Sequence, residues 1–160
     1  MVRLVPMTPA EFDGFIGGLI RDYAADHVAA GRWTPDVAEA EARTEIERLV
    51  PAGVATPNHL LFQIIADAAD ARVGVAWVAI EPRGAFVYYI EIFEAHRRRG
   101  YAEQAMRQLE MIALERGATK TLLHVFGTNS AARKLYAKLG YEETNVLMAK
   151  GLAPPPAPTG

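Results

Sequence analysis

The chain has 160 residues, of which 51% are hydrophobic and 22% charged, a composition typical of one soluble globular domain. Its 17 basic and 19 acidic residues give a formal net charge of −2, so no global attraction draws it to nucleic acid or to an anionic membrane. Cysteine is absent, which excludes disulfides, thiolate metal sites and a cysteine nucleophile. The sequence shows neither a long apolar run nor a secretory pattern, so we expect no membrane span and a cytoplasmic location.

Serine and histidine exclude two further classes of site. Ser130 is the only serine, and it does not stand in the Gly-x-Ser-x-Gly elbow of many serine hydrolases. The histidines show no i, i+4 pair and no carboxylate at metal-ligand spacing. We therefore expect chemistry without a metal and without a covalent intermediate.

The first part of the chain is predicted to form a strand, two helices and a hairpin. Residues 2–6 form a short strand, and Thr8 with Glu11 makes a capping box at the start of the first helix. One face of that helix carries an apolar stripe at the helical period: Phe12, Phe15, Ile16, Leu19, Ile20 and Tyr23. The elements that follow are a helix at about 35–50 and a hairpin of strands at 59–67 and 72–80.

Strands and helices alternate in the remainder. Residues 85–93 are almost continuously apolar or aromatic, which indicates a central strand buried on both faces. The later elements are a helix at 100–116, a strand at 119–126, a helix at 130–139 and a closing strand at 142–150. The strand–helix–strand order implies a parallel pair, whereas the hairpin is antiparallel. The sequence therefore predicts an α/β fold with a mixed sheet, in one domain over residues 1–152, followed by an extended proline-rich tail at 153–160.

Three arginines and a glycine stand between a predicted strand and a predicted helix, at Arg97, Arg98, Arg99 and Gly100. A helix N-terminus presents unpaired N–H groups and the positive end of its dipole, which suits a phosphate. Gly100 allows close approach of the backbone, small Ala102 leaves room one turn later, and arginines add charge-assisted contacts. The alternative is a solvated basic run, but cations at this end of a helix oppose its dipole, so the pattern favours a polyphosphate site.

The segment Arg97-x-x-Gly100-x-Ala102 resembles the pyrophosphate loop of the GNAT superfamily of acetyl-CoA-dependent N-acetyltransferases, Gln/Arg-x-x-Gly-x-Gly/Ala. Ile92 matches the aliphatic residue at the end of that family's splayed central strand. Further positions match in order and spacing: Leu123, Val125, Asn129, Ala132, Leu135, Tyr136, Leu139, Gly140 and Tyr141. The resemblance covers about residues 85–152, with Glu94-Ala95 departing from it where the family often has proline.

The resemblance implies a GNAT-like fold, in which the fourth and fifth strands splay apart and helices flank both faces of the sheet. The pantetheine arm of acetyl-CoA would fill that wedge and pair with the backbone of Glu91, Ile92 and Phe93. The pyrophosphate would sit on the N–H groups of Arg97, Arg98, Arg99, Gly100, Tyr101 and Ala102. Asn129 would hydrogen-bond the pantetheine from the other side, and Ala132 also belongs to the expected cofactor site.

The resemblance also implies that Tyr136 is the general acid toward the leaving thiolate, or a donor that orients the sulfur. Its helical face alone, shared with Ala132, Leu135 and Leu139, favours a core residue, and the motif reverses that preference. An N–H group of Ile92 or Phe93 would serve the oxyanion. Glu91 is the candidate base, because a carboxylate in an apolar strand requires a partner or a purpose. An ion pair with an arginine is its alternative role, His124 is a second candidate, and water can also deprotonate the amine.

We expect the acceptor to bind near the first two helices and the loop between them, at Tyr23, His27 and Trp33. Other candidates lie on the central strand: Phe86, Tyr88 and Tyr89. The resemblance therefore implies transfer of an acetyl group to a primary amine of an unidentified small molecule or peptide. A longer acyl group, a protein N-terminus or lysine as acceptor, another nucleotide as ligand, and a non-catalytic CoA-binding regulatory module stay open. Dimers are frequent among similar proteins, so a homodimer is also open.

Overall fold

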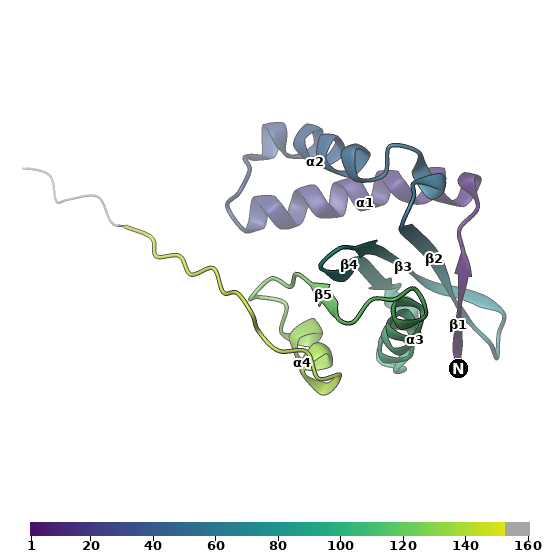
Figure 1. Cartoon of the computed structure of the whole chain (residues 1–160). Helices are drawn as coiled ribbons and strands as arrows, with labels where there is room; N and C mark the ends of the chain where they lie inside the picture. Colours follow the sequence, from purple (N-terminus) through teal and green to yellow (C-terminus); the bar gives the residue numbers. More distant parts are fainter. Residues whose placement is uncertain (153–160) are drawn as a thin grey trace, which may run out of the picture.

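The computed structural model describes residues 1–152, which form one five-stranded sheet with helices on both faces (Figure 1). The strands are β1 (Val2–Pro6), β2 (His59–Ala66), β3 (Ala71–Glu81), β4 (Gly84–Ile92) and β5 (Thr121–Leu123). The helices are α1 (Pro9–Ala29), α2 (Pro35–Leu49), α3 (Tyr101–Glu115) and α4 (Ser130–Lys138), with short 3₁₀ turns η1 (Gly53–Ala55) and η2 (Glu94–His96). None of the helices in this part of the chain is long and apolar enough to cross a membrane. The predicted tail at 153–160 lies outside the described residues.

The sheet is mixed and its fourth and fifth strands splay, as predicted. The strands follow one another in sequence order, with antiparallel pairing from β1 to β4 and parallel pairing between β4 and β5. The parallel pairing joins only Ala85–Val87 to Thr121–Leu123. Just beyond it β4 bulges at Tyr88, because Val78 of β3 pairs with Val87 and Trp77 with Tyr89. β4 then continues to Ile92 without β5 beside it.

Two apolar cores hold the helices against the two faces of the sheet. The predicted capping box forms at the start of α1, where the Glu11 N–H donates to Thr8 Oγ1 at 3.3 Å and the Thr8 N–H to Glu11 Oε2 at 2.7 Å. The core under α1 and α2 contains Leu19, Ile20, Ala38, Ala42, Ile46, Leu61, Val75 and Trp77. The core under α3 contains Ile64, Val73, Ala76, Val78, Val87, Ile92, Ala105, Met106, Leu109 and Ala113. Because helices cover both faces of the sheet, the side chains on both sides of the middle strands are buried. This explains why these strands are apolar throughout.

The C-terminal part of the described chain differs from the prediction. β5 ends at Leu123 instead of residue 126, and the predicted closing strand at 142–150 has no regular secondary structure. This segment leaves the body of the protein (Figure 1, yellow). A strand is stable only when a neighbour pairs its peptide groups, and within residues 1–152 no strand lies beside the outer edge of β5. The prediction of a closing strand is therefore wrong for a single chain.

Gly74 of β3 allows the end of β4 to lie close. A Cβ atom on Gly74 would lie 2.1 Å from the carbonyl oxygen of Glu91 and 3.0 Å from Cδ1 of Ile92. Gly74→Ala must therefore displace β4, and we expect the free energy of unfolding in urea to fall by about 1–3 kcal/mol. Gly127→Ala is the control, because nothing lies within 4 Å of a Cβ atom there. Equal urea midpoints for the two variants would contradict this role of Gly74.

Candidate active site

The end of β4 directs one set of backbone groups into the gap between β4 and β5. The Phe93 N–H donates to the Val73 carbonyl at 2.9 Å, and Ile92 stands opposite Gly74. Because successive residues of an antiparallel strand direct their peptide groups to opposite sides, the N–H and C=O of Ile92 point away from β3. Of the two N–H groups predicted to serve an oxyanion, that of Phe93 is thus already used in the sheet. Ile92 supplies the one that faces the gap.

The arginine–glycine turn presents the open N-terminus of α3. Arg98 and Gly100 both have left-handed backbone conformations, with φ of 63° and 75°. Gly100 is the N-cap residue, and no side chain of the described residues caps this helix. A Cβ atom at Gly100 would meet only Gln104 Nε2, at 3.8 Å, so the backbone here is open to a ligand. The first N–H groups of α3, at Tyr101 and Ala102, therefore form a donor cluster with the positive helix end, which suits an anion.

The three arginines of this turn are not equivalent. Arg97 Nε donates to the Ile92 carbonyl at 2.9 Å, and a second guanidinium nitrogen lies 4.0 Å from Glu91 Oε1. The Arg97 side chain is therefore turned back to β4, although the sequence suggested that it contacts phosphate. Within residues 1–152, Arg98 and Arg99 make no side-chain hydrogen bond or ion pair, and both are exposed. They are the guanidinium groups available to an anion on the helix.

Helix α4 carries the predicted residues on the opposite side of the gap. Asn129 is its N-cap residue, and its Oδ1 accepts from the Ala132 N–H at 3.1 Å, which leaves the side-chain NH₂ for a ligand. The half-buried ring of Tyr136 packs on the core under α3 and lies 5.7 Å from the ring of Tyr141.

The hydroxyl of Tyr136 makes no hydrogen bond within the described residues, where no fully buried side-chain oxygen or nitrogen lacks a partner. The hydroxyl therefore reaches solvent, while the ring itself is half-buried. Burial raises the pKa of Tyr136 above its ordinary value of 10.0, so the phenol stays protonated at neutral pH. Tyr136 thus combines a place in the core with a solvent-accessible donor group, and its role as general acid stays a prediction.

Glu91 belongs to a hydrogen-bonded group that joins β4 to α1. The Tyr89 hydroxyl lies 3.2 Å from Glu91 Oε2 and also 3.2 Å from Asp22 Oδ2. Burial, followed by the two carboxylates, raises the pKa of Tyr89 far above its ordinary value, so it remains a neutral donor. Arg97 is thus the arginine partner that the alternative, structural role of Glu91 requires. Glu91 is also the residue directly before Ile92, whose peptide groups face the gap. The role of Asp22 had no sequence signal, because it is one of several polar residues on α1.

Aromatic side chains from the helices and from the loop after β5 contact one another in the region where we expected the acceptor to bind. The His27 ring lies 4.3 Å from that of Tyr23 and 4.6 Å from that of Trp33. Phe126, in the loop after β5, reaches His27 at 5.8 Å, so the helical layer meets the C-terminal side of the gap. The Tyr23 hydroxyl donates to Glu45 at 2.9 Å, and burial lowers the pKa of His27, which favours its neutral form. The structure thus brings together the three acceptor candidates from the helices.

The aromatic residues predicted on the central strand have different surroundings. Tyr88 stacks on Trp77 at 4.7 Å and donates to Glu81 at 2.7 Å, so its hydroxyl is held within the protein. Phe86 is buried and packs edge-on against His124 at 5.3 Å. His124 itself is exposed. Tyr89 is therefore the aromatic residue of β4 that contacts the candidate base.

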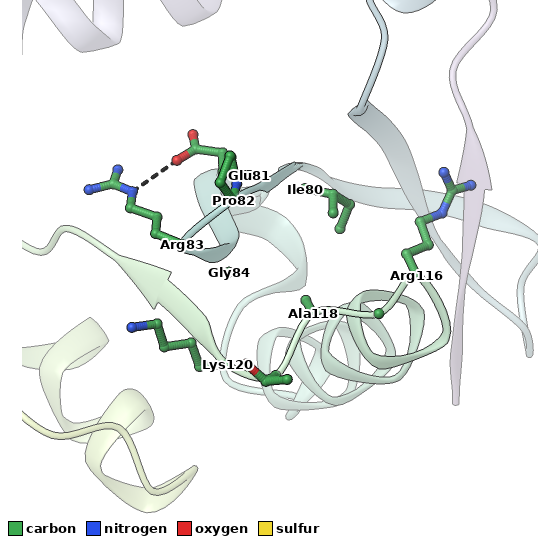
Figure 2. Close-up of a pocket in the computed structure, with 10 residues that line it drawn as sticks. Ile80, Glu81, Pro82, Arg83, Gly84, Arg116, Ala118 and Lys120 are labelled. Atoms are coloured by element: carbon green, nitrogen blue, oxygen red, sulfur yellow. Dashed lines mark hydrogen bonds and ion pairs between the residues drawn. The ribbon is translucent and has the colours of Figure 1, made fainter.

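A separate pocket of about 340 Å³ lies between the β3–β4 turn and the loop from α3 to β5 (Figure 2). It is lined by Arg83, Arg116 and Lys120 among others, and Arg83 pairs with Glu81 at 2.9 Å. This pocket borders the C-terminal end of α3, roughly 22 Å along the helix from Gly100 at 1.5 Å per residue. None of the predicted site residues lines it, and carbonyl groups at this helix end disfavour anions. It is not the predicted cofactor site.

Comparison with known proteins agrees with these features of the site: the gap between β4 and β5, the open N-terminus of α3, and Tyr136 on α4. Residues 16–141 match the acetyltransferase (GNAT) family. The chain belongs to the GNAT family. The uncharacterised N-acetyltransferase YycN of Bacillus subtilis (strain 168) is 37% identical over 155 residues, 94% of this GNAT chain and 99% of YycN.

Two further comparisons support the same family, and a third shows the same fold in a more distant protein. The crystal structure of YycN has a TM-score of 0.89 and 36% identity, and covers 96% of this GNAT chain and 100% of YycN. YdgE, another uncharacterised N-acetyltransferase of B. subtilis (strain 168), is 35% identical over 93% of this chain and 97% of YdgE. AAC(6')-Iy, solved in complex with the bisubstrate analogue CoA-S-monomethyl-acetylneamine, shares the fold at a TM-score of 0.61 and 18% identity, over 96% and 99% of the two chains.

Proposed function

We propose that this GNAT chain transfers an acetyl group from acetyl-CoA to a primary amine of a small molecule or peptide, by direct attack in a ternary complex. The observation that carries the proposal is the gap between β4 and β5, onto which the Ile92 peptide groups face. The uncapped start of α3 borders one side, and Tyr136 on α4 supplies a solvent-accessible phenol. The GNAT family uses acetyl-CoA, and these groups include hydrogen-bond donors of the kind that a pantetheine diphosphate requires.

Each part of the coenzyme has a group of matching chemistry. The N–H groups of Tyr101 and Ala102 would hold the pyrophosphate, with added charge from Arg98 and Arg99. The Ile92 C=O would accept a hydrogen bond from an amide N–H of the pantetheine, and the Asn129 NH₂ would donate from α4. The Ile92 carbonyl already accepts from Arg97, but a carbonyl oxygen has two lone pairs and can accept a second bond.

The transfer requires a neutral amine, a stabilised oxyanion and a protonated thiolate. The amine nitrogen attacks the thioester carbonyl carbon, a C–N bond forms and the C–S bond breaks. The Ile92 N–H faces the position where the oxygen gains charge, and such a donor contributes about 3 kcal/mol elsewhere. Glu91 takes the amine proton, and Tyr136 gives its proton to the departing sulfur. The raised pKa of Tyr136 keeps this proton in place until it is needed.

Two measurements test the proposal. Acetyl-CoA at a hundred times its Kd should stabilise the protein by about 2.7 kcal/mol, seen as a rise in Tm. Release of free CoA thiol should then be followed against a library of amines and peptides. No stabilisation at millimolar acetyl-CoA would contradict the cofactor assignment. Stabilisation without thiol release from any amine would instead support a CoA-binding regulatory module.

Glu91→Gln tests the proposed base. The amide keeps the size of the side chain but cannot take a proton, so we expect kcat/KM for the amine to fall about 100-fold at neutral pH, within the range for general bases. Stabilisation by acetyl-CoA should not change. Glu94→Gln, on an exposed residue of η2, is the matched control. Equal kcat/KM for both variants would show that water deprotonates the amine.

A further inference from the structure

The Tyr89 hydroxyl lies between two carboxylates that come from different layers of the protein. It is 3.2 Å from Oδ2 of Asp22 on α1 and 3.2 Å from Oε2 of Glu91 on β4. A phenol has one hydrogen, so it donates to only one of these carboxylates at a time. Whichever carboxylate receives the hydrogen bond, the other lacks this donor. The direction of one O–H bond thus links α1 to the end of β4.

The alternation of β4 and the packing of α1 hold the phenol in this place. Tyr89 and Glu91 are two positions apart on the strand, so their side chains lie on one face, which α1 and α2 cover (Figure 1). The ring of Phe15, two turns before Asp22 on α1, lies 5.8 Å from the ring of Tyr89. Burial, followed by the two carboxylates, raises the pKa of Tyr89, so the phenol keeps its hydrogen at neutral pH. Helix α1 therefore contacts both the ring and the hydroxyl of a neutral donor.

The two carboxylates differ in their other partners. Within residues 1–152 the Asp22 side chain forms no ion pair, and its one hydrogen bond is with Tyr89. Asp22 is exposed, so its carboxylate remains hydrated. Glu91 has a second neighbour, because a guanidinium nitrogen of Arg97 lies 4.0 Å from its Oε1. Oε2 is the oxygen of Glu91 that the phenol contacts, so the direction of the Tyr89 hydroxyl decides whether this oxygen is free to take a proton.

We propose that Tyr89 and Asp22 are positioning residues for the base Glu91, and that the phenol reverses its hydrogen bond when Glu91 takes the proton of the amine. The phenol first turns from Glu91 to Asp22, and the amine proton binds to the free Oε2 of Glu91. The new O–H group then donates to the oxygen of Tyr89, whose own hydrogen remains donated to Asp22. The phenol keeps its O–H bond throughout, and Glu91 later returns the proton to water. This inference rests on the proposed function, because it requires Glu91 to be the base.

Asp22 is the group that makes this reversal possible. Once Glu91 is protonated, its O–H group and that of Tyr89 are both donors, so the phenol needs another acceptor. Asp22 is that acceptor, and an acceptor that carries a charge forms a stronger hydrogen bond than a neutral one. Before proton transfer the phenol has Glu91 as an acceptor, so the loss of Asp22 matters little at that stage. Asp22 therefore favours the transfer step over the binding of the amine.

Asp22→Ala tests this role in steady-state kinetics with the most active amine of the thiol-release library. The variant removes the acceptor at an exposed position of α1, where alanine favours the helix. We expect kcat to fall about 10-fold, with KM for the amine, Kd for acetyl-CoA and Tm nearly unchanged. Asp26→Ala is the matched control, because it removes an exposed carboxylate one turn further along α1 that has no hydrogen bond with Tyr89. Equal kcat for the two variants, whether lowered or unchanged, would overturn the proposal.

A double-mutant cycle tests whether Asp22 acts through the phenol. Tyr89→Phe removes the hydroxyl and keeps the ring that packs near Phe15, and we expect it also to lower kcat about 10-fold. In that background Asp22→Ala should change kcat by less than about twofold, because no phenol hydrogen is left to accept. Asp22→Asn keeps a carbonyl acceptor, so its kcat should lie between those of wild type and Asp22→Ala. Additive losses in the double variant, or equal kcat for the alanine and asparagine variants, would contradict the reversal.

The same measurements separate a failure of this inference from a failure of the proposed function. A loss of kcat/KM in Glu91→Gln together with wild-type kcat in Asp22→Ala and Tyr89→Phe would keep Glu91 as the base and reject its two positioning residues. Wild-type kcat/KM in Glu91→Gln would reject the base and this inference with it. Absence of thiol release from the wild-type protein with every amine would reject the acetyl transfer itself. The expected result is a loss of kcat in all three variants.

Discussion

Gly100→Val should weaken acetyl-CoA binding by about 10- to 100-fold, since holding a β-branched residue at positive φ costs about 1–3 kcal/mol and every 1.4 kcal/mol is tenfold in affinity. Gly100 has φ of 75°, and valine avoids this region, so the turn must shift. That shift moves the N–H groups of Tyr101 and Ala102 away from the positions where they meet a pyrophosphate. Isothermal titration with acetyl-CoA measures the effect directly.

Gly117→Val is the control that separates binding from stability. Gly117 follows the other end of α3, has φ of 85°, and a Cβ atom there would have nothing within 4 Å. The two substitutions therefore impose the same kind of backbone strain on the two ends of one helix. Both should lower Tm, and Gly100→Val alone should raise the Kd for acetyl-CoA. A comparable rise in Kd for Gly117→Val would mean that the turn acts only through the stability of α3.

Local patterns in the sequence were sufficient for the framework of the fold. The capping box at Thr8, the apolar stripe of α1 and the glycine at the start of α3 each reflect interactions between residues four or fewer positions apart. Such interactions do not depend on the rest of the chain. The parallel pair follows from the strand–helix–strand order alone. The elements around the gap were therefore predictable from local patterns, whereas the roles proposed for Ile92, Asn129 and Tyr136 came from the resemblance to the GNAT family.

Details that depend on strand register were not predictable. The bulge at Tyr88 decides which peptide groups of β4 face β3, and hence that Ile92 and not Phe93 has an N–H in the gap. No local pattern indicates where an extra residue enters a strand. The contact of Tyr89 with Asp22 joins residues 67 positions apart, and the Arg97 side chain turns back to the strand before it. These contacts arise only from the packing of α1 and the turn against the sheet.

The predictions of the two C-terminal strands were wrong for a related reason. Apolar character at Val146–Met148 indicates that the segment favours a buried strand, but a strand also requires a partner, and a sequence does not state which chain supplies it. Within residues 1–152 the outer edge of β5 has no neighbouring strand, and residues 142–150 form none. A prediction from pattern can thus be right about the conformation of a segment and wrong about its place in one molecule.

Tyr136→Phe should lower kcat about 100-fold or more, the effect typical of losing a general acid, while the Kd for acetyl-CoA changes little. The substitution removes only a hydroxyl, and this hydroxyl makes no hydrogen bond within the described residues, so the ring keeps its packing on the core. The pH dependence of wild-type turnover is a second test of this role. Burial raises the pKa of Tyr136 above 10.0, and an acid acts only while protonated, so wild-type activity that depends on it should fall only above pH 10.

Tyr141→Phe is the matched control for this change. Its ring lies 5.7 Å from that of Tyr136, but its hydroxyl accepts a hydrogen bond from Thr121 and burial raises its pKa to about 12. Losing that bond should cost about 1 kcal/mol of stability with little change in kcat. Tyr136→Phe should show the opposite pattern, with nearly unchanged Tm and a large loss of turnover. Unchanged turnover in Tyr136→Phe across a panel of amines would leave Tyr136 as a core residue and assign protonation of the thiolate to water.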